Sequence, residues 1–296
     1  MSVLALLLLL TAAGFLLVSL CGNVIYWYET LNTPEERIPS PRPGVYVCVR
    51  HYCATLISYI LCNALVVAGP FLGKKPRSAA ETGKSGASLP PVVLVHGLNN
   101  NAGAWFYIAR ALERRGYNVS TFSYWSLFTS MEDILRGFDR HVTAVSEAGG
   151  GAPVVVCHSL GGLLTRKWLD EYKSKDRLRG LITLGTPHGG SKMAVFALGA
   201  LARSIRPDGA LIASLRRAEA LDGLPCVSLV SPEDEAVLPA RSLLPPQGWK
   251  MVVTPPRGHF SMLISPLTAR IVLEELESMA TLPFREARAP DPERPT

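Results

Sequence analysis

The chain has 296 residues, 48% of them hydrophobic, and a formal net charge of +6. This length accommodates one ordinary domain with additional segments and excludes two large domains. The basic excess is modest and dispersed, without zinc-finger spacing or a basic stripe interleaved with aromatic residues, so no nucleic-acid partner is expected.

The N-terminal region, residues 1–76, is expected to attach the protein to a membrane through one or two hydrophobic helices. Residues 3–20 carry no charge and are long enough to cross a bilayer core, and Tyr26, Trp27 and Tyr28 follow as an interfacial aromatic group. No Lys or Arg precedes the apolar run, so a retained anchor is favoured over a cleaved signal peptide.

A second apolar run, residues 54–72, ends at Lys74, Lys75 and Arg77. It also contains polar residues and a proline, so a second transmembrane helix and a membrane-surface or domain-packing helix both remain open. The expected location is a membrane, with the bacterial inner membrane favoured. If both runs cross it, the positive-inside rule slightly favours a cytoplasmic C-terminal domain, and the side of the membrane on which this domain lies stays open.

Residues 77–89 have the composition of a linker, and residues 283–296 that of a disordered tail. Between them, in residues 90–282, strand-like runs alternate with helical patterns. This alternation predicts an α/β domain with a mostly parallel sheet and helices on both faces. The expected strands are residues 92–95, 119–124, 154–156, 181–184, 227–230 and 251–253, and capped helices are expected after Ser130 and Ser265.

Residues 154–162, VVVCHSLGG, predict a buried strand that turns sharply into a helix with Ser159 at the tip of the turn. The residues two before and two after that serine must be small, which Gly161 satisfies fully and Cys157 adequately. Such a turn presents a nucleophilic hydroxyl. The alternative is a serine that only caps the following helix.

A serine nucleophile needs a base, and the base needs an acid that orients it. His259 follows the last expected strand and is the best base candidate, while His51 and His141 are expected to be surface or packing residues. The loop after the preceding strand supplies Asp234 as the chosen acid, which gives the order serine, acid, histidine. Glu233 and Glu235 are its rivals, and a solvated acidic turn is the other interpretation.

The oxyanion of an acyl-transfer intermediate must be met by backbone N–H groups that already point at it. One is expected from Leu160, directly after the nucleophile. The other is expected from Leu98, in the turn after the first strand, where Gly97 would allow a close backbone approach.

Five motifs in this order resemble the α/β hydrolases of the bacterial lipase and esterase type, over about residues 90–280. They are Val-His-Gly-Leu (95–98), Cys-His-Ser-Leu-Gly-Gly (157–162), Leu-Gly-Thr-Pro-His-Gly-Gly-Ser (184–191), Ser-Pro-Glu-Asp-Glu-Ala-Val-Leu-Pro (231–239) and Gly-His-Phe (258–260). The resemblance implies that Ser159 is the nucleophile, with Asp234 and His259 as its partners and Leu98 and Leu160 as oxyanion donors. It implies ester hydrolysis. No cofactor and no metal-ligand residues are expected, while a bound calcium and the oligomeric state stay open. Cys157 departs from the glycine usual at its position.

Residues 192–223 are expected to form a small helical cap of two helices over the site, although a plain packed helical pair is equally compatible with their pattern. An anchor beside the site suggests lipid or medium-to-long acyl esters, phospholipids included, as substrates. The alternatives are an acyl-thioesterase or acyltransferase with the same triad, and a catalytically silent membrane-bound binding module. The residues expected to line the substrate pocket are His96, Gly97, Tyr124, Trp125, Phe128 and Phe196.

Overall fold

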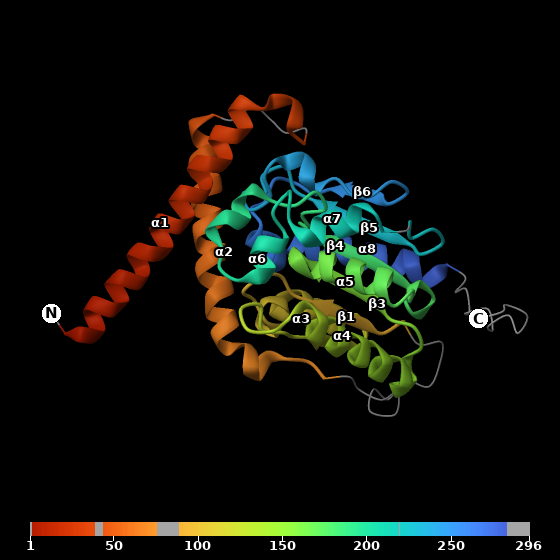
Figure 1. Cartoon of the computed structure of the whole chain (residues 1–296). Coiled ribbons are helices and arrows are strands. Elements are labelled where there is room, and N and C mark those ends of the chain that lie inside the picture. Colours follow the sequence, from red (N-terminus) through yellow and green to blue (C-terminus); the bar gives the residue numbers. More distant parts are fainter. Residues whose placement is uncertain (1, 39–43, 76–88, 219, 283–296) are drawn as a thin grey trace, which may run out of the picture.

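Six parallel strands form the centre of the protein, in the order β2-β1-β3-β4-β5-β6 (Figure 1). The computed structural model describes residues 2–38, 44–75, 89–218 and 220–282. The expected linker therefore lies outside the described residues except for Leu89, and the expected tail lies wholly outside them. The strands are β1 Val92–Val95, β2 Val119–Phe122, β3 Val154–His158, β4 Gly180–Leu184, β5 Cys226–Val230 and β6 Lys250–Val253.

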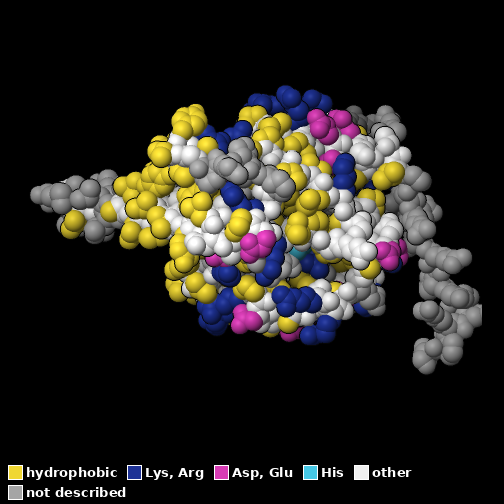
Figure 2. Space-filling view, turned by 90° about the horizontal axis from the view of Figure 1, so that it is seen from above, with side chains coloured by type: hydrophobic (Ala, Val, Ile, Leu, Met, Phe, Trp, Pro, Cys, Tyr) yellow, Lys and Arg dark blue, Asp and Glu magenta, His cyan; other side chains and the backbone are white. Residues whose placement is uncertain are grey.

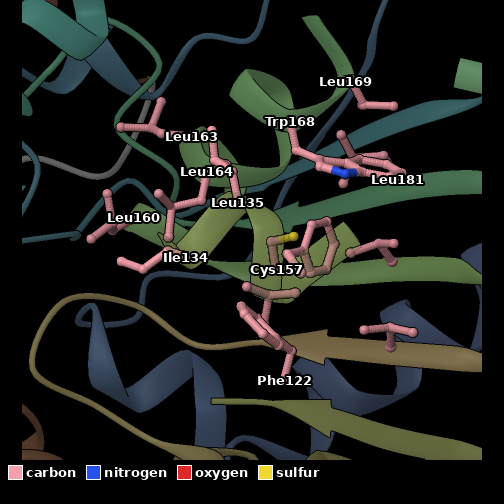
Figure 3. Close-up of a cluster of buried hydrophobic side chains, with 14 of the residues drawn as sticks. Phe122, Ile134, Leu135, Cys157, Leu160, Leu163, Leu164, Trp168, Leu169 and Leu181 are labelled. Atoms are coloured by element: carbon pink, nitrogen blue, oxygen red, sulfur yellow. The ribbon is translucent and has the colours of Figure 1, made fainter. Parts of the chain in front are cut away.

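Helices cover both faces of this sheet, as the alternating pattern predicted. On one face, α4 (Met131–Val145) and α5 (Leu160–Glu171) pack in a buried cluster in which Figure 3 shows Phe122, Cys157 and Trp168. On the other face, α3 (Phe106–Arg114) and α8 (Pro266–Thr281) pack on the strands. Strands β1, β3, β4 and β5 are buried along their whole length, which explains their continuous runs of apolar residues.

Two helix starts follow the expected capping chemistry. The Ser130 side chain accepts a hydrogen bond from the Asp133 N–H, and the Ser265 side chain accepts one from the Thr268 N–H. Strand β2 is two residues shorter than expected. It ends at Phe122 because the Tyr124 N–H donates to the His96 ring at 3.1 Å rather than to a neighbouring strand.

The segment 192–223 contains three short helical pieces where two helices were expected. They are a 3₁₀ turn, Lys192–Phe196, and the helices α6 (Ala200–Ser204) and α7 (Ala210–Arg216). The first expected helix is divided because Gly199 has φ +99°, a conformation that no helix contains.

Two long helices precede the sheet domain. Helix α1 (Val3–Asn32) crosses α2 (Val45–Leu72), and α2 lies along the sheet domain on the side where α6 is also found (Figure 1). By length and composition alone, α2 is long and apolar enough to cross a membrane. It nevertheless contacts the sheet domain along most of its length, including the loops at the carboxyl ends of the strands.

Candidate active site

The loops that follow β1, β3, β5 and β6 meet at one edge of the sheet, because the carboxyl ends of parallel strands lie together. These loops carry Leu98, Ser159, Asp234 and His259 in turn. Four positions that are distant in the sequence are therefore brought to the same edge.

Ser159 occupies a strained turn between β3 and α5. Its backbone has φ +54° and ψ −124°, which is rare for a residue other than glycine. The turn is held by the Ser159 N–H, which donates to the Leu184 carbonyl, and by the Thr186 hydroxyl, which donates to the Ser159 carbonyl. The side chain of Ser159 lines a cavity of about 220 Å³ that His259 also lines.

His259 is buried, and its Nδ1 lies 2.8 Å and 2.9 Å from the two carboxylate oxygens of Asp234. We assign the Nδ1 proton to this interaction, which leaves Nε2 without a proton and able to accept one. Ser159 and His259 line the same cavity, but the Ser159 hydroxyl and His259 Nε2 form no hydrogen bond in this structure. In apo sites such bonds are often long.

The two rival acids have different partners. The Glu235 carboxylate accepts the backbone N–H of His259 at 2.9 Å, and the Glu233 carboxylate accepts a bond from Arg50 at 2.8 Å. Of the three acidic residues in this loop, Asp234 is the one whose carboxylate meets the imidazole.

The charge environment favours a basic imidazole at His259. Burial disfavours the charged ring, but the charge of Asp234, its hydrogen bond to the ring and the charge of Glu235 together outweigh burial and raise the pKa of His259 above its usual value. By contrast, burial lowers the pKa of the neighbouring His158 well below that of a free imidazole. The two rings lie 4.4 Å apart between centroids, and of the pair His259 is the stronger base.

Of the two expected oxyanion donors, Leu98 lines the cavity and Leu160 directly follows Ser159. Leu160 is the first residue of α5, so its N–H has no acceptor inside the helix. Leu98 lines the cavity, and its N–H donates to no acceptor in the part of the chain that the structure describes. Both amides are thus available to an oxygen atom bound beside Ser159.

The residues expected to line the substrate pocket are divided between two environments. His96 and Tyr124 are buried and stacked on each other at 4.2 Å, and burial lowers the pKa of His96 to about 4. Gly97 lies directly against Ser159. Trp125, Phe128 and Phe196 are largely exposed. None of the six residues is among those that line the cavity that contains Ser159. Their contact with substrate stays a prediction.

Helix α2 contributes a wall of the cavity that the sequence did not indicate. Tyr59, Cys62 and Asn63 line it together with Ser159 and His259. No local pattern marks these α2 residues, because their position depends on a long-range contact between a hydrophobic helix and the loops that carry Ser159 and His259.

Glycines near Ser159 are required by close backbone packing. A Cβ at Gly161 would lie 2.5 Å from the Val95 carbonyl oxygen, and these backbone atoms cannot move freely. We expect Gly161→Ala to destabilise the protein by about 1–3 kcal/mol and to lower its melting temperature by several degrees. Thermal unfolding in detergent solution measures this. The matched control is Gly137→Ala in α4, where the new Cβ would meet Phe122 at an ordinary 3.5 Å and helix propensity would improve. A melting temperature for Gly161→Ala at or above that of Gly137→Ala would contradict the packing argument.

Comparison with known proteins places the fold. Residues 90–206 match the family model described as alpha/beta hydrolase fold, and a search of curated protein sequences found no match. Similar solved structures include a mature Bacillus licheniformis lipase (TM-score 0.57, 20% identity, covering 65% of this chain and 94% of the lipase chain). A second is a Paleococcus ferrophilus monoacylglycerol lipase, with a TM-score of 0.50 and 17% identity, covering 66% of this chain and 96% of the lipase chain. A third is Aspergillus fumigatus lipase B, with a TM-score of 0.54 and 16% identity, covering 81% of this chain and 63% of the lipase chain. At these identities the similarity establishes the architecture.

Proposed function

We propose that this chain, which has the α/β-hydrolase fold, is a membrane-anchored serine hydrolase that cleaves carboxylic esters of lipids. The observation that carries the proposal is the buried bond between His259 Nδ1 and Asp234, in a cavity shared with Ser159 on its strained turn. A nucleophile, a base and an orienting acid on separate loops are the arrangement that acyl transfer needs.

In the proposed reaction, the Ser159 hydroxyl attacks the acyl carbon while its proton passes to Nε2 of His259. Asp234 holds the ring by Nδ1 and stabilises the imidazolium that forms. The N–H groups of Leu98 and Leu160 meet the developing oxyanion. The alcohol leaves with the proton from His259, which gives the acyl-enzyme. A water molecule then gives its proton to His259 and attacks the acyl carbon, and Ser159 leaves with that proton as the acid is released.

Two features support a lipidic ester as the substrate. Exposed apolar side chains from the segment 195–198 lie at the edge of the site, where Met193, Ala194 and Ala197 already line the cavity. The site also adjoins α2, whose composition suits contact with lipid. Medium-to-long acyl chains, phospholipids included, would therefore find apolar surface beside Ser159.

A substrate panel with the purified protein in detergent tests this proposal. Oxyesters of increasing acyl length, an acyl thioester, and an oxyester with an added alcohol acceptor would be compared. We expect turnover to favour medium and long oxyesters and vesicle phospholipid over acetate esters. Equal turnover of short soluble esters with no activity on vesicles would reject the lipid substrate. Dominant thioester cleavage or transfer to alcohol would identify a different acyl chemistry, and no turnover at all would indicate a silent binding module.

The acid side of the pH profile reports His259. The ring must be neutral to accept the serine proton, so kcat/KM should fall as the pH falls through the pKa of His259. Since Asp234 raises this pKa, the midpoint is expected above the 6.5 of an ordinary histidine. Initial rates from pH 4 to 9 on one soluble ester measure it, and a midpoint well below 6.5 would count against this environment.

A further inference from the structure

We infer that α2 lies in the surface of a lipid leaflet, parallel to the membrane plane, with one side on the α/β domain and the other in lipid. Length and composition make α2 a candidate transmembrane helix. Its two sides differ, however, and the difference determines how it can meet a membrane. The inference does not depend on the proposed hydrolysis.

The inner side of α2 consists of polar or small residues and forms hydrogen bonds with the α/β domain. His51 Nε2 lies 2.9 Å from the Glu233 carbonyl oxygen, and the Ser261 hydroxyl donates to Ser58 at 2.9 Å. The buried residues on this side are His51, Thr55, Ser58, Cys62 and Gly69. Their spacing of three, four and seven residues forms one stripe along the helix.

The contact is equally close near the C-terminal end of α2. The Asn101 side chain donates to the Val66 carbonyl at 2.7 Å. A Cβ at Gly103 would lie only 1.9 Å from the Leu65 carbonyl oxygen, so the two backbones are in direct contact. The polar stripe of α2 is therefore packed on the α/β domain from its first turns to its last.

This length of contact is incompatible with a helix that crosses the bilayer. The helical stretch from His51 to Gly69 extends about 27 Å, close to the roughly 30 Å thickness of the hydrocarbon core. If α2 crossed the membrane, the segment that contains Ser261 would lie well inside the hydrocarbon core, and the loops that contain Asn101 and Glu233 would lie near its two edges. Loops with free backbone polar groups are excluded from lipid, so α2 meets the membrane along its side.

The outer side of α2 is apolar and exposed along the whole helix. Val67 and Phe71, one helical turn apart, are 80% and 90% exposed. Exposing two neighbouring large apolar side chains to water is unfavourable. The exposed apolar residues are Val45, Tyr46, Val49, Ile57, Ile60, Leu61, Val67 and Phe71.

Helix α1 indicates that lipid covers this outer side. Its N-terminal half leads away from α2 on the side opposite the α/β domain (Figure 1), and Figure 2 shows hydrophobic side chains on the part of this projection whose side chains the structure describes. Residues 3–20 carry no charge, so this half of α1 is suited to enter the hydrocarbon core. Lys74 pairs with Glu113 of the α/β domain at 3.2 Å, and the exposed Lys75 beside it suits contact with anionic headgroups.

This placement has a consequence that does rest on the proposed function. Tyr59, Cys62 and Asn63 of α2 line the cavity that contains Ser159. A leaflet along the outer side of α2 would therefore lie beside the catalytic cavity, and a lipid ester could enter without first crossing water.

Depth measurements on spin-labelled full-length protein test the inference. In a background with the accessible Cys21, Cys48 and Cys53 replaced by Ala, single cysteines would be introduced at Val49, Ile60 and Phe71, all on the outer side. Each variant, with a melting temperature near that of the background, would be labelled and reconstituted into phosphatidylcholine–phosphatidylglycerol vesicles. Relative collision rates with oxygen and with a water-soluble nickel chelate give the depth. A label at the exposed Ser278 of α8 serves as the aqueous control.

We expect the three α2 labels to lie at similar shallow depths, about 5–10 Å below the headgroup boundary. A label at Ile60 near the bilayer centre, with Val49 and Phe71 at opposite surfaces, would overturn the inference in favour of a membrane-crossing helix. Labels as accessible to the nickel chelate as the Ser278 control would also overturn it, because this result would show that no lipid contacts α2. Strong spin–spin broadening would also overturn it, because a second copy would then cover this side. None of these outcomes depends on whether the protein hydrolyses esters.

Discussion

Replacing Ser159 with Ala is expected to lower kcat/KM for a soluble ester by about 10⁴-fold or more. The substitution removes the attacking oxygen and leaves no other nucleophile, among the described residues, on the strained turn between β3 and α5. The loss should appear in kcat more than in KM, since the hydroxyl acts mainly in the chemical step.

Ser278→Ala is the matched control for this experiment. Ser278 is exposed on α8, and its side chain has no part in the cavity. Its kcat/KM should equal that of the unaltered protein. If Ser159→Ala retained more than about a tenth of the activity while its melting temperature was unchanged, another group would have to be the nucleophile.

Replacing Asp234 with Asn should lower kcat by roughly 10³–10⁴-fold, because an amide cannot stabilise the imidazolium and can select the wrong tautomer of His259. It should also move the acid limb of the pH profile to lower pH, since the charge of Asp234 raises the pKa of His259 more than that of Glu235 does. The displaced limb separates an electrostatic effect from a general loss of folding. Initial rates across the pH range measure both quantities.

Glu233→Gln provides the comparison on the same loop. Its carboxylate faces Arg50, whose side chain is 40% exposed, and does not face the imidazole. A partly exposed ion pair contributes about 1 kcal/mol or less to the free energy of unfolding, so this variant should stay folded. Because the Glu233 carboxylate binds Arg50 and not His259, kcat/KM should fall by no more than about fivefold and the acid limb should stay in place. If Glu233→Gln and Asp234→Asn had equal effects, the assignment of the orienting acid would be wrong.

The α/β architecture was predictable because its signals are local. Buried parallel strands leave runs such as residues 92–95 and 154–156, and helix starts leave capping residues such as Ser130 and Ser265. The parallel sheet with helices on both faces is confirmed. Order along the chain was also enough to bring Ser159, Asp234 and His259 to one edge, because every strand points the same way.

The features that escaped prediction depend on contacts between distant segments. The early end of β2 results from the hydrogen bond between Tyr124 and His96, and no pattern in either segment marks it. The break at Gly199 follows from one backbone conformation inside an otherwise helical pattern.

The role of α2 was hidden for another reason. Its apolar composition reflects its exposed outer side. Its inner side is identified only by the hydrogen bonds that it forms with the segments containing Glu233, Asn101 and Ser261. A hydrophobic segment with scattered polar residues is compatible with a weak membrane span and with a helix packed on a domain. Only the partners of those polar residues distinguish the two.

The most direct measurement of the central claim is the reaction of the protein with a fluorophosphonate, which modifies an activated serine. Peptide mapping by mass spectrometry should find one adduct per chain, at Ser159, and His259→Ala should slow its formation at least 100-fold. An unmodified Ser159 in well-folded protein, an adduct at a different serine, or labelling at the same rate without His259 would contradict the account.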